Sequence, residues 1–278
     1  MITLNTIYNE NCIITLSRMP DKFIDMTLTS PPYDGRRTYE GEHKFDFEEF
    51  KVIAKELYRV TKEGGIVVWV VADETRNYCE SLTSFKQAIY FVEECKFNLL
   101  DTMIYYKCPS CFRGMPKVMC DRKYTNSYEY MFVFSKGIPK TFNPILIKTM
   151  PVIKTERSTS LRKESGILRP IKYEHKEFKS LDNIWKILPN DNTDNKENES
   201  IHPAVFPKQL VIDHIKSWSN EGDIIYDPFS GSGTVAKCCK LMNRKYIGSE
   251  IVRKYWLMGN ITLKRTDDRK KGSALWKI

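Results

Sequence analysis

The sequence IIYDPFSGSGTVAKCCKLMNRKYIGSE occupies residues 224–250. It begins with a short β-branched run and passes through a glycine-rich turn. From residue 234 to residue 242 its apolar residues recur with helical spacing, and residues 245–248 then favour a second strand. A strand, a turn, a helix and a strand in this order form a βαβ unit, so the stretch predicts an α/β fold with a mostly parallel sheet.

The turn itself, DPFSGSGT at residues 227–234, differs from the common phosphate-binding loops. No Gly-Lys-Ser/Thr follows it, and Ala236 stands where a dinucleotide fingerprint has its third glycine. Asp227 opens the turn, and Glu250 ends the next strand at the position of a ribose-hydroxyl acceptor. A leading carboxylate suits a ligand with a cationic amino-acid end better than a pyrophosphate. The alternative is a structural glycine turn that Asp227 caps, with Glu250 in solvent.

The region that precedes this unit also alternates between strand and helix patterns. Residues 25–28 form a strand-like run that stops at TSPPY (29–33), where two prolines impose a rigid loop. Residues 46–60 predict a helix with a capping box at Asp46 and Glu49, ended by Gly64 and Gly65. Further expected elements are a buried strand at 66–71, a helix at 85–95, and strands at 99–106 and 128–134.

Composition limits the class of protein. The chain has 278 residues, 41% of them hydrophobic, which excludes a mostly disordered chain. Its longest apolar run covers residues 66–72, far less than the roughly 20 residues of a membrane span. Polar Asn9, Glu10 and Asn11 stand where a signal peptide would be apolar. Eight cysteines form no disulfide scaffold. We therefore expect a cytoplasmic protein that has no membrane association.

The net charge of +9 is concentrated in one stretch. Residues 137–187 contain eleven basic and five acidic residues, without clear hydrophobic periodicity. This stretch is either a solvated insertion or a nucleic-acid contact surface, where Lys and Arg displace counterions from phosphates. The polar sequence NDNTDNKENES at 190–200 predicts a flexible linker, and a second basic cluster lies at residues 264–271.

Together, TSPPY at 29–33 and DPFSGSGT at 227–234 resemble the two signature motifs of the amino-methyltransferases that act on DNA bases. Here the catalytic motif comes first and the cofactor loop near the C-terminus, the permuted order of the beta class of that family. Residues 128–136 resemble the strand beside the target base. Residues 202–207 resemble the segment that packs on the methionine end of the cofactor. Residues 8–12 resemble the adenine segment, with Asn11 where the family usually has an acid.

The resemblance implies a Rossmann-like S-adenosylmethionine-dependent methyltransferase fold with a mixed, mostly parallel sheet and an inserted target-recognition region. The implied domains are a catalytic and cofactor-binding domain (1–136 and 200–260), a target-recognition insertion with its linker (137–199) and a basic C-terminal tail (261–278). The implied cofactor is S-adenosyl-L-methionine and the implied partner is double-stranded DNA. A homodimer and a cognate restriction endonuclease stay open.

The resemblance also assigns roles to individual residues. The catalytic residues are Ser30, Pro31, Pro32 and Tyr33. The cofactor-binding residues are Asn11, Thr29, His202, Pro203, Phe206, Asp227, Pro228, Phe229, Ser230, Gly231, Ser232, Gly233, Thr234 and Glu250. The basic stretch supplies the DNA-binding candidates Arg157, Arg162, Lys163, Arg169 and Lys172.

The residue types of the catalytic motif suit an exocyclic amine of a flipped-out base. Tyr33 offers an aromatic face to the base, while the Ser30 hydroxyl and the Pro31 carbonyl can accept the amine hydrogens. Methylation at a ring carbon would need a Pro-Cys nucleophile, and the neighbouring pair here is Cys108-Pro109, in the opposite order. We therefore expect direct transfer to an amino nitrogen, with no metal in the reaction.

Several alternatives stay open. Ser30 is commoner in the cytosine-N4 enzymes of this family, whereas an acid at that position is common in the adenine-N6 enzymes, so cytosine-N4 is favoured over adenine-N6. A non-catalytic nucleic-acid-binding homologue, an RNA substrate, and a small-molecule or protein methyltransferase are the rival interpretations. Cys108, Cys111 and Cys120 have spacing that fits three zinc ligands, or they are reduced structural cysteines.

Overall fold

The computed structural model describes residues 1–32, 45–107, 124, 126–149, 159–162, 168–171, 176–188 and 205–272. The chain divides into two compact units, the first formed by Met1–Asn143 with Asn183–Ile278 and the second by Pro144–Asp182. The first unit contains both signature motifs.

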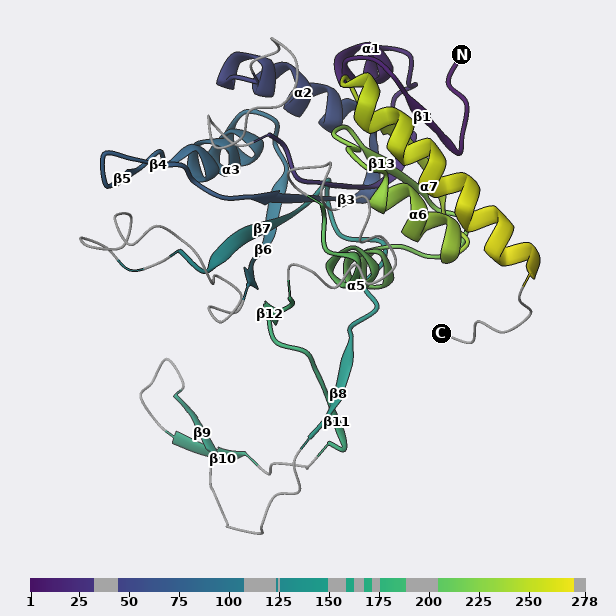
Figure 1. The fold of residues 1–278 in the computed structure, drawn as a ribbon. Coiled ribbons are helices and arrows are strands. Elements are labelled where there is room, and N and C mark those ends of the chain that lie inside the picture. The colour runs from purple at the N-terminus through teal and green to yellow at the C-terminus, as the bar shows by residue number, and fades with distance from the viewer. Residues whose placement is uncertain are drawn as a thin grey trace. The chain divides into compact units, whose positions relative to one another are not determined.

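The first unit is built on an eight-stranded sheet in the order β1-β14-β13-β2-β3-β7-β6-β12 (Figure 1). β7 runs antiparallel to both of its neighbours, and the other pairings are parallel. The predicted mostly parallel mixed sheet is therefore confirmed. The strands are β1 (Thr6–Tyr8), β2 (Ile24–Thr29), β3 (Thr61–Val71), β6 (Asn98–Tyr106), β7 (Tyr128–Ser135), β12 (Ile184–Lys186), β13 (Ile224–Asp227) and β14 (Lys245–Ser249).

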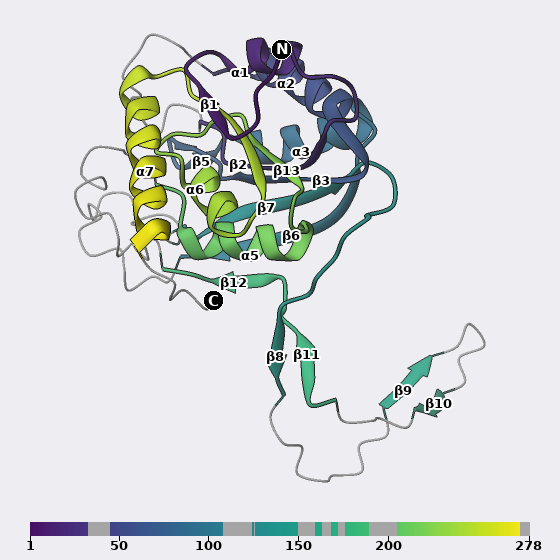
Figure 2. The same ribbon diagram turned by 90° about the vertical axis from the view of Figure 1, so that its right-hand side faces the viewer.

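Helices cover both faces of this sheet (Figures 1 and 2). On one face lie α1 (Cys12–Ser17), α2 (Phe47–Val60) and α3 (Thr83–Glu93). On the other face lie α5 (Lys208–Trp218), α6 (Thr234–Leu241) and α7 (Arg253–Gly272). Along the chain, β3 and α3 are connected by a two-stranded hairpin of β4 (Thr75–Arg76) and β5 (Cys79–Glu80). The strand–helix alternation seen in the sequence thus produces a three-layer α/β unit.

The boundary between α2 and β3 differs from the prediction. Gly64 and Gly65 do not end the helix, because α2 stops at Val60 and both glycines lie inside β3. Gly64 has φ +75°, and a Cβ there would lie 2.8 Å from the Cβ of Lys140. The register between β2 and β3 also shifts between Ile24 and Met26. The glycines therefore allow β3 to be irregular and to pass close to the segment around Lys140.

Aromatic side chains fill the layer between the sheet and α2 and α3. Trp69 of β3 is fully buried and meets Phe50 and Phe91 edge to face, with ring centroids 5.7 and 5.2 Å apart. Its indole nitrogen donates to Gln87 Oε1 at 2.8 Å, so the one polar atom of the ring is satisfied. This packing fixes β3 against two helices and so supports the strand beside the catalytic motif.

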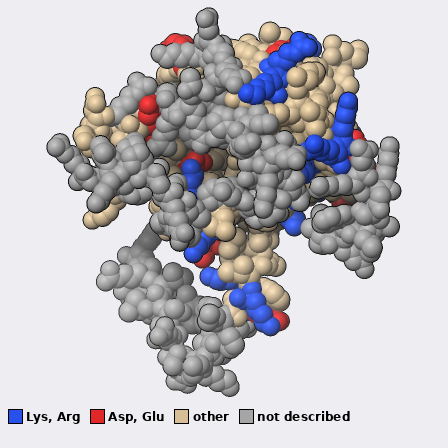
Figure 3. Space-filling view, viewed as in Figure 1, with Lys and Arg blue, Asp and Glu red and all other residues tan. Residues whose placement is uncertain are grey.

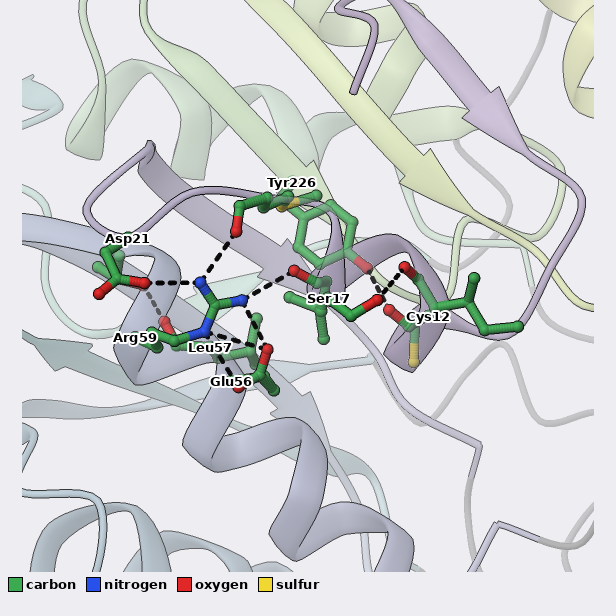
Figure 4. Close-up of polar contacts among 11 residues, drawn as sticks. Cys12, Ser17, Asp21, Glu56, Leu57, Arg59 and Tyr226 are labelled. Atoms are coloured by element: carbon green, nitrogen blue, oxygen red, sulfur yellow. Dashed lines mark hydrogen bonds and ion pairs between the residues drawn. The ribbon is translucent and has the colours of Figure 1, made fainter. Parts of the chain in front are cut away.

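Arg59 joins the ends of α1 and α2 (Figure 4). Its guanidinium donates to the carbonyl oxygens of Leu16 and Met19, and to the carboxylates of Asp21 and Glu56. The hydrogen bonds and charges of these two carboxylates raise the pKa of Arg59 above its usual value, against the effect of burial. A planar, permanently charged donor thus links the end of α1 and the segment after it to the last turn of α2.

The second unit contains two antiparallel strand pairs. β8 (Leu146–Lys148) pairs with β11 (Phe178–Ser180), and β9 (Thr159–Arg162) pairs with β10 (Leu168–Ile171). The unit is shorter than the insertion predicted at 137–199, because residues 137–143 and strand β12 belong to the first unit. Its role in target recognition stays a prediction.

The sequence predicted a basic tail at 261–278. The structure instead continues α7 to Gly272, so the basic cluster at 264–271 lies in a helix. Figure 3 shows Lys and Arg along this helix, and among its described side chains Arg253, Lys254, Lys264 and Arg265 are exposed. Among the described residues, no helix is both long enough and apolar enough to cross a membrane.

Candidate functional site

The two signature motifs meet at the carboxyl edge of the sheet. β13, which ends in Asp227, lies directly beside β2, which ends in Thr29. The Thr29 hydroxyl donates to Asp227 Oδ1 at 2.7 Å, and both residues are buried. A hydrogen bond thus joins two segments that are separated by 198 residues in the chain. Ligands of open α/β sheets bind at this edge, so the motifs lie where a site is expected.

The glycine turn between β13 and α6 adopts backbone conformations that side chains disfavour. Gly231 has φ 50° and Gly233 has φ 78°. A Cβ on Gly233 would lie 3.0 Å from the Cα of Gly259 in α7, so the turn passes close to that helix. α6 begins at Thr234, as the sequence predicts, and its buried Cys238 and Cys239 belong to the core.

Two buried carboxylates flank this turn. Burial raises the pKa of Asp227 to about 7, while hydrogen bonds from Thr29 and the Phe229 amide lower it and the Glu250 charge raises it. Burial also raises the pKa of Glu250, whose two oxygens accept from the backbone amides of Gly231 and Val252, each at 2.8 Å. A carboxylate therefore already holds the amide that would bind a phosphate, which favours a ligand without phosphates.

Asn11, the departure from the family pattern, is held in place by two contacts. Its side-chain oxygen accepts from the Ile13 amide at 2.8 Å and caps α1. Its amide nitrogen donates to Glu49 Oε1 at 2.9 Å. The predicted capping box is present in part, since Asp46 accepts from the Glu49 amide at 2.9 Å. The Glu49 side chain pairs instead with Asn11, a partner 38 residues away that local spacing cannot reveal.

The described part of the catalytic motif continues directly from β2. Pro31 is buried, while Ser30 and Pro32 are half-buried. Strand β2 therefore delivers the Ser30 hydroxyl and the Pro31 carbonyl to the edge that also carries Asp227. Tyr33 lies outside the described residues.

The remaining predicted residues of the cofactor loop lie with the two carboxylates. Pro228, Ser230 and Ser232 are buried, and Phe229 meets Phe45 edge to face with ring centroids 5.4 Å apart. Phe206 is half-buried next to Pro207, the N-cap of α5.

Other predicted residues fall beyond what the structure describes. His202 and Pro203, the DNA-binding candidates Arg157, Lys163 and Lys172, and the cysteines Cys108, Cys111 and Cys120 lie outside the described residues. Arg162 ends β9 and Arg169 lies in β10 of the second unit. Among the described residues, no group of three His, Cys, Asp or Glu side chains could hold a metal ion.

The structure adds polar groups at this edge that the sequence did not single out. Asp73, which follows β3, accepts from the Ser84 amide at 3.0 Å and from the Ser84 hydroxyl at 2.5 Å, and so holds the start of α3. Lys107, which follows β6, forms an ion pair with Glu129 of β7. Both features depend on strand pairings that bring distant residues together, so no local motif marks them.

The donor set of the edge fits S-adenosyl-L-methionine. Asp227 is a buried carboxylate suited to a cationic amino group, and Glu250 retains acceptor capacity for a nucleoside hydroxyl. Phe229 and Phe45 supply apolar surface. These residues match the three chemical parts of that molecule, which are an amino acid, a sulfonium and a nucleoside.

Comparisons with known proteins agree with this assignment. A family model described as N6_N4_Mtase, DNA methylase, matches residues 24–260. The orphan methyltransferase M.BamHII of Bacillus amyloliquefaciens is 47% identical over 255 residues, which cover 88% of this chain and 90% of that protein. The DNA adenine methyltransferase YhdJ of Escherichia coli (strain K12) is 27% identical over 273 residues, which cover 94% of this chain and 82% of that protein.

A solved structure shares the fold over nearly the whole chain. The PvuII DNA methyltransferase, described as cytosine-N4-specific, superimposes with a TM-score of 0.68 at 19% identity, covering 96% of this chain and 92% of that one. Other structures with this fold hold S-adenosyl-L-methionine. The length of the family match, the close relative and the joined motifs lead to one conclusion: this chain belongs to the N6/N4 DNA methylase family, whose methyl donor is S-adenosyl-L-methionine.

Proposed function

We propose that the protein transfers a methyl group from S-adenosyl-L-methionine to the exocyclic N4 amine of a flipped-out cytosine in double-stranded DNA, at a specific sequence. The observation that carries this proposal is the hydrogen bond between Thr29 and Asp227, which holds the TSPPY motif against the cofactor loop. Direct transfer requires the amine and the methyl donor to lie side by side, and preorganisation of this kind lowers the barrier.

The residues at the carboxyl edge of the sheet have two roles, binding the cofactor and binding the target base. Asp227 holds the cationic amino end of the cofactor, and Glu250 accepts from its nucleoside. Ser30 and the Pro31 carbonyl accept the two hydrogens of the target amine, which turns the nitrogen lone pair out of the base ring. Tyr33 stacks on the extruded base, a contact worth roughly 1–3 kcal/mol. When bound, S-adenosyl-L-methionine supplies an electrophilic methyl group on its sulfonium.

A second candidate is the N6 amine of adenine. The family name covers both amines, and the relative from Escherichia coli is an adenine enzyme. Ser30 in place of an acid favours cytosine, because Ser is commoner in the cytosine-N4 branch of the family. We also propose that the second unit, which contains Arg162 and Arg169, is the target-recognition region. We propose that the protein acts in the cytoplasm. A homodimer and a cognate endonuclease stay predictions.

Nucleoside mass analysis tests the proposal directly. Plasmid DNA that lacks cytosine and adenine methylation is incubated with the protein and S-adenosyl-L-methionine, then digested to nucleosides. The expected product is N4-methylcytosine, and sequencing of the treated plasmid locates the site. N6-methyladenine as the product would refute the cytosine assignment, and no methylated nucleoside would refute the enzymatic function.

Two substitutions connect the activity to the motif. Ser30→Ala and Tyr33→Ala should abolish methylation while the binding of S-adenosylhomocysteine is kept, because both residues act on the base and not on the cofactor. Full activity in either variant would contradict the assignment of TSPPY as the catalytic motif. Parallel assays on duplex DNA and on RNA of the same sequence identify the nucleic acid.

A further inference from the structure

The ion pair between Lys107 and Glu129 has no part in the function proposed above. Lys107 Nζ donates to Glu129 Oε1, and the side chains are 19% and 10% exposed. Lys107 Nζ also lies 5.7 Å from the centre of the Tyr105 ring. Removing two charges from water costs several kcal/mol per ion, and mutual attraction often fails to offset this cost. Stability alone therefore gives little reason for a charged pair at this place.

Strand register places this pair on the same face of the sheet as Ser30. Side chains two residues apart on a strand share a face, and position 30, one residue past the end of β2, falls in register with the face of Leu28. Lys107, one residue past the end of β6, lies on the face of Tyr105, since its Nζ is near the Tyr105 ring and pairs with Glu129. Cross-strand partners link these positions through β3 and β7. The pairs are Leu28 with Val68, Val68 with Val133, Val70 with Met131, Met131 with Met103, and Tyr105 with Glu129. Position 30, Glu129 and Lys107 thus fall in register on one face, at one edge of the sheet.

The distance across the sheet suits a base held between two polar ends. β2 and β6 are separated by β3 and β7. At about 4.8 Å per strand interval, three intervals place their ends about 14 Å apart. The long Lys107 side chain covers part of this distance. A base and its two flanking hydrogen bonds, each about 2.9 Å long, occupy the rest.

We propose that Lys107 is a specificity-determining residue that donates a hydrogen bond to the 2-carbonyl oxygen of the flipped cytosine, with Glu129 as its positioning residue. This inference rests on the proposed function. In cytosine the 2-carbonyl and the 4-amine flank N3 on one edge of the ring and their bonds diverge, so Ser30 and Pro31 hold the amine while Lys107 reaches the carbonyl from the other strand. Adenine has no carbonyl group, so Lys107 would keep Glu129 but lose the hydrogen bond to the base, which disfavours adenine.

A cycle that combines protein and substrate variants tests this contact. Duplexes carry either cytosine or 2-thiocytosine at the target position found by sequencing, because sulfur is a weak hydrogen-bond acceptor. The proteins are the unaltered chain, Lys107→Met, and the double variant K107M/E129L, which leaves no unpaired charge. Lys62→Met is the matched control, since Lys62 pairs with Asp25 at 2.7 Å near the opposite ends of β2 and β3.

The unaltered chain and Lys62→Met should prefer cytosine over 2-thiocytosine by about tenfold in kcat/KM, the usual size for a hydrogen bond to a charged group. Lys107→Met and K107M/E129L should lose this preference while S-adenosylhomocysteine affinity is kept. A purely structural pair would lower both rates equally and keep the preference, which would overturn the proposal. Absence of any preference in the unaltered chain, or adenine as the methylated base, would overturn it too. Failure of the proposed function is distinct, because it gives no methylated nucleoside at all.

Discussion

Cofactor affinity should rise with pH between 6 and 7, because a proton competes with the cofactor for Asp227. Burial raises the pKa of Asp227 to about 7 in the free protein, so the carboxyl is largely protonated at pH 6. The cationic amino group of the cofactor needs the ionised form. Binding must therefore release this proton, and the apparent affinity follows the ionised fraction.

The size of the effect follows from the pKa. About 9% of Asp227 is ionised at pH 6 and about half at pH 7, so affinity should increase about fivefold, or ~1 kcal/mol. The amino group of the ligand stays cationic throughout this range. The dependence should level off above pH 7, and binding at pH 6 should release about 0.9 proton per molecule bound.

Isothermal titration calorimetry with S-adenosylhomocysteine measures both quantities. Titrations in two buffers with different ionisation enthalpies give the number of protons released at each pH. Asp227→Asn should bind more weakly and lose the pH dependence. Glu250→Gln should bind more weakly and keep a pH dependence whose midpoint moves to lower pH, because the Glu250 charge raises the pKa of Asp227. Equal affinity of the unaltered chain at pH 6 and pH 7, with no proton release, would refute the role assigned to Asp227.

Three further predictions follow from the contacts described above. Thr29→Val removes a hydrogen bond that lowers the pKa of Asp227, so the midpoint of the same pH profile should move to higher pH; an unchanged midpoint would contradict the link between the motifs. Burial lowers the pKa of His214 to about 3 from 6.5, so the unfolded chain binds more protons and stability should fall as pH drops below 6.5, by at most about 1.4 kcal/mol per pH unit. His214→Phe should flatten the dependence of the free energy of unfolding on pH, measured by urea unfolding at pH 5 to 7. An equal slope of this free energy against pH in both proteins would contradict the lowered pKa of His214. Arg59→Ala should lower the free energy of unfolding by about 1–3 kcal/mol, because it leaves the Leu16 and Met19 carbonyls without this donor, whereas Lys51→Ala, which breaks an exposed pair with Glu48, should change it by less than about 1 kcal/mol.

Local patterns predicted the elements that carry the site. The runs before TSPPY and DPFSGSGT become β2 and β13, and the helices that begin at Phe47 and Thr234 lie close to their predicted starts. Each of these elements has its own signal, such as a β-branched run, a capping residue or a glycine turn. Prediction failed where a signal had two meanings, as when Gly64 and Gly65 suggested a helix end but lie inside a strand.

Long-range pairings were beyond what local patterns can predict. The contact of Asn11 with Glu49, the ion pair of Lys107 with Glu129, and the hydrogen bond between Thr29 and Asp227 each depend on tertiary structure. The same is true of β12, a short strand in the basic stretch that joins the main sheet beside β6. The family resemblance brought the two motifs together in advance, whereas spacing in the chain could not.

The pairing of β2 with β13 also has a consequence for the synthesis of the protein. Met26 pairs with Ile225, so the fourth and third strands of the sheet cannot meet until roughly 200 further residues have been translated. At 5–20 residues per second this takes about 10–40 seconds. During that time β2 has no partner on one side, and an unpaired strand edge invites association with other chains. A nascent chain stalled before residue 224 should therefore depend on chaperones, and release of the C-terminal strands should end that dependence.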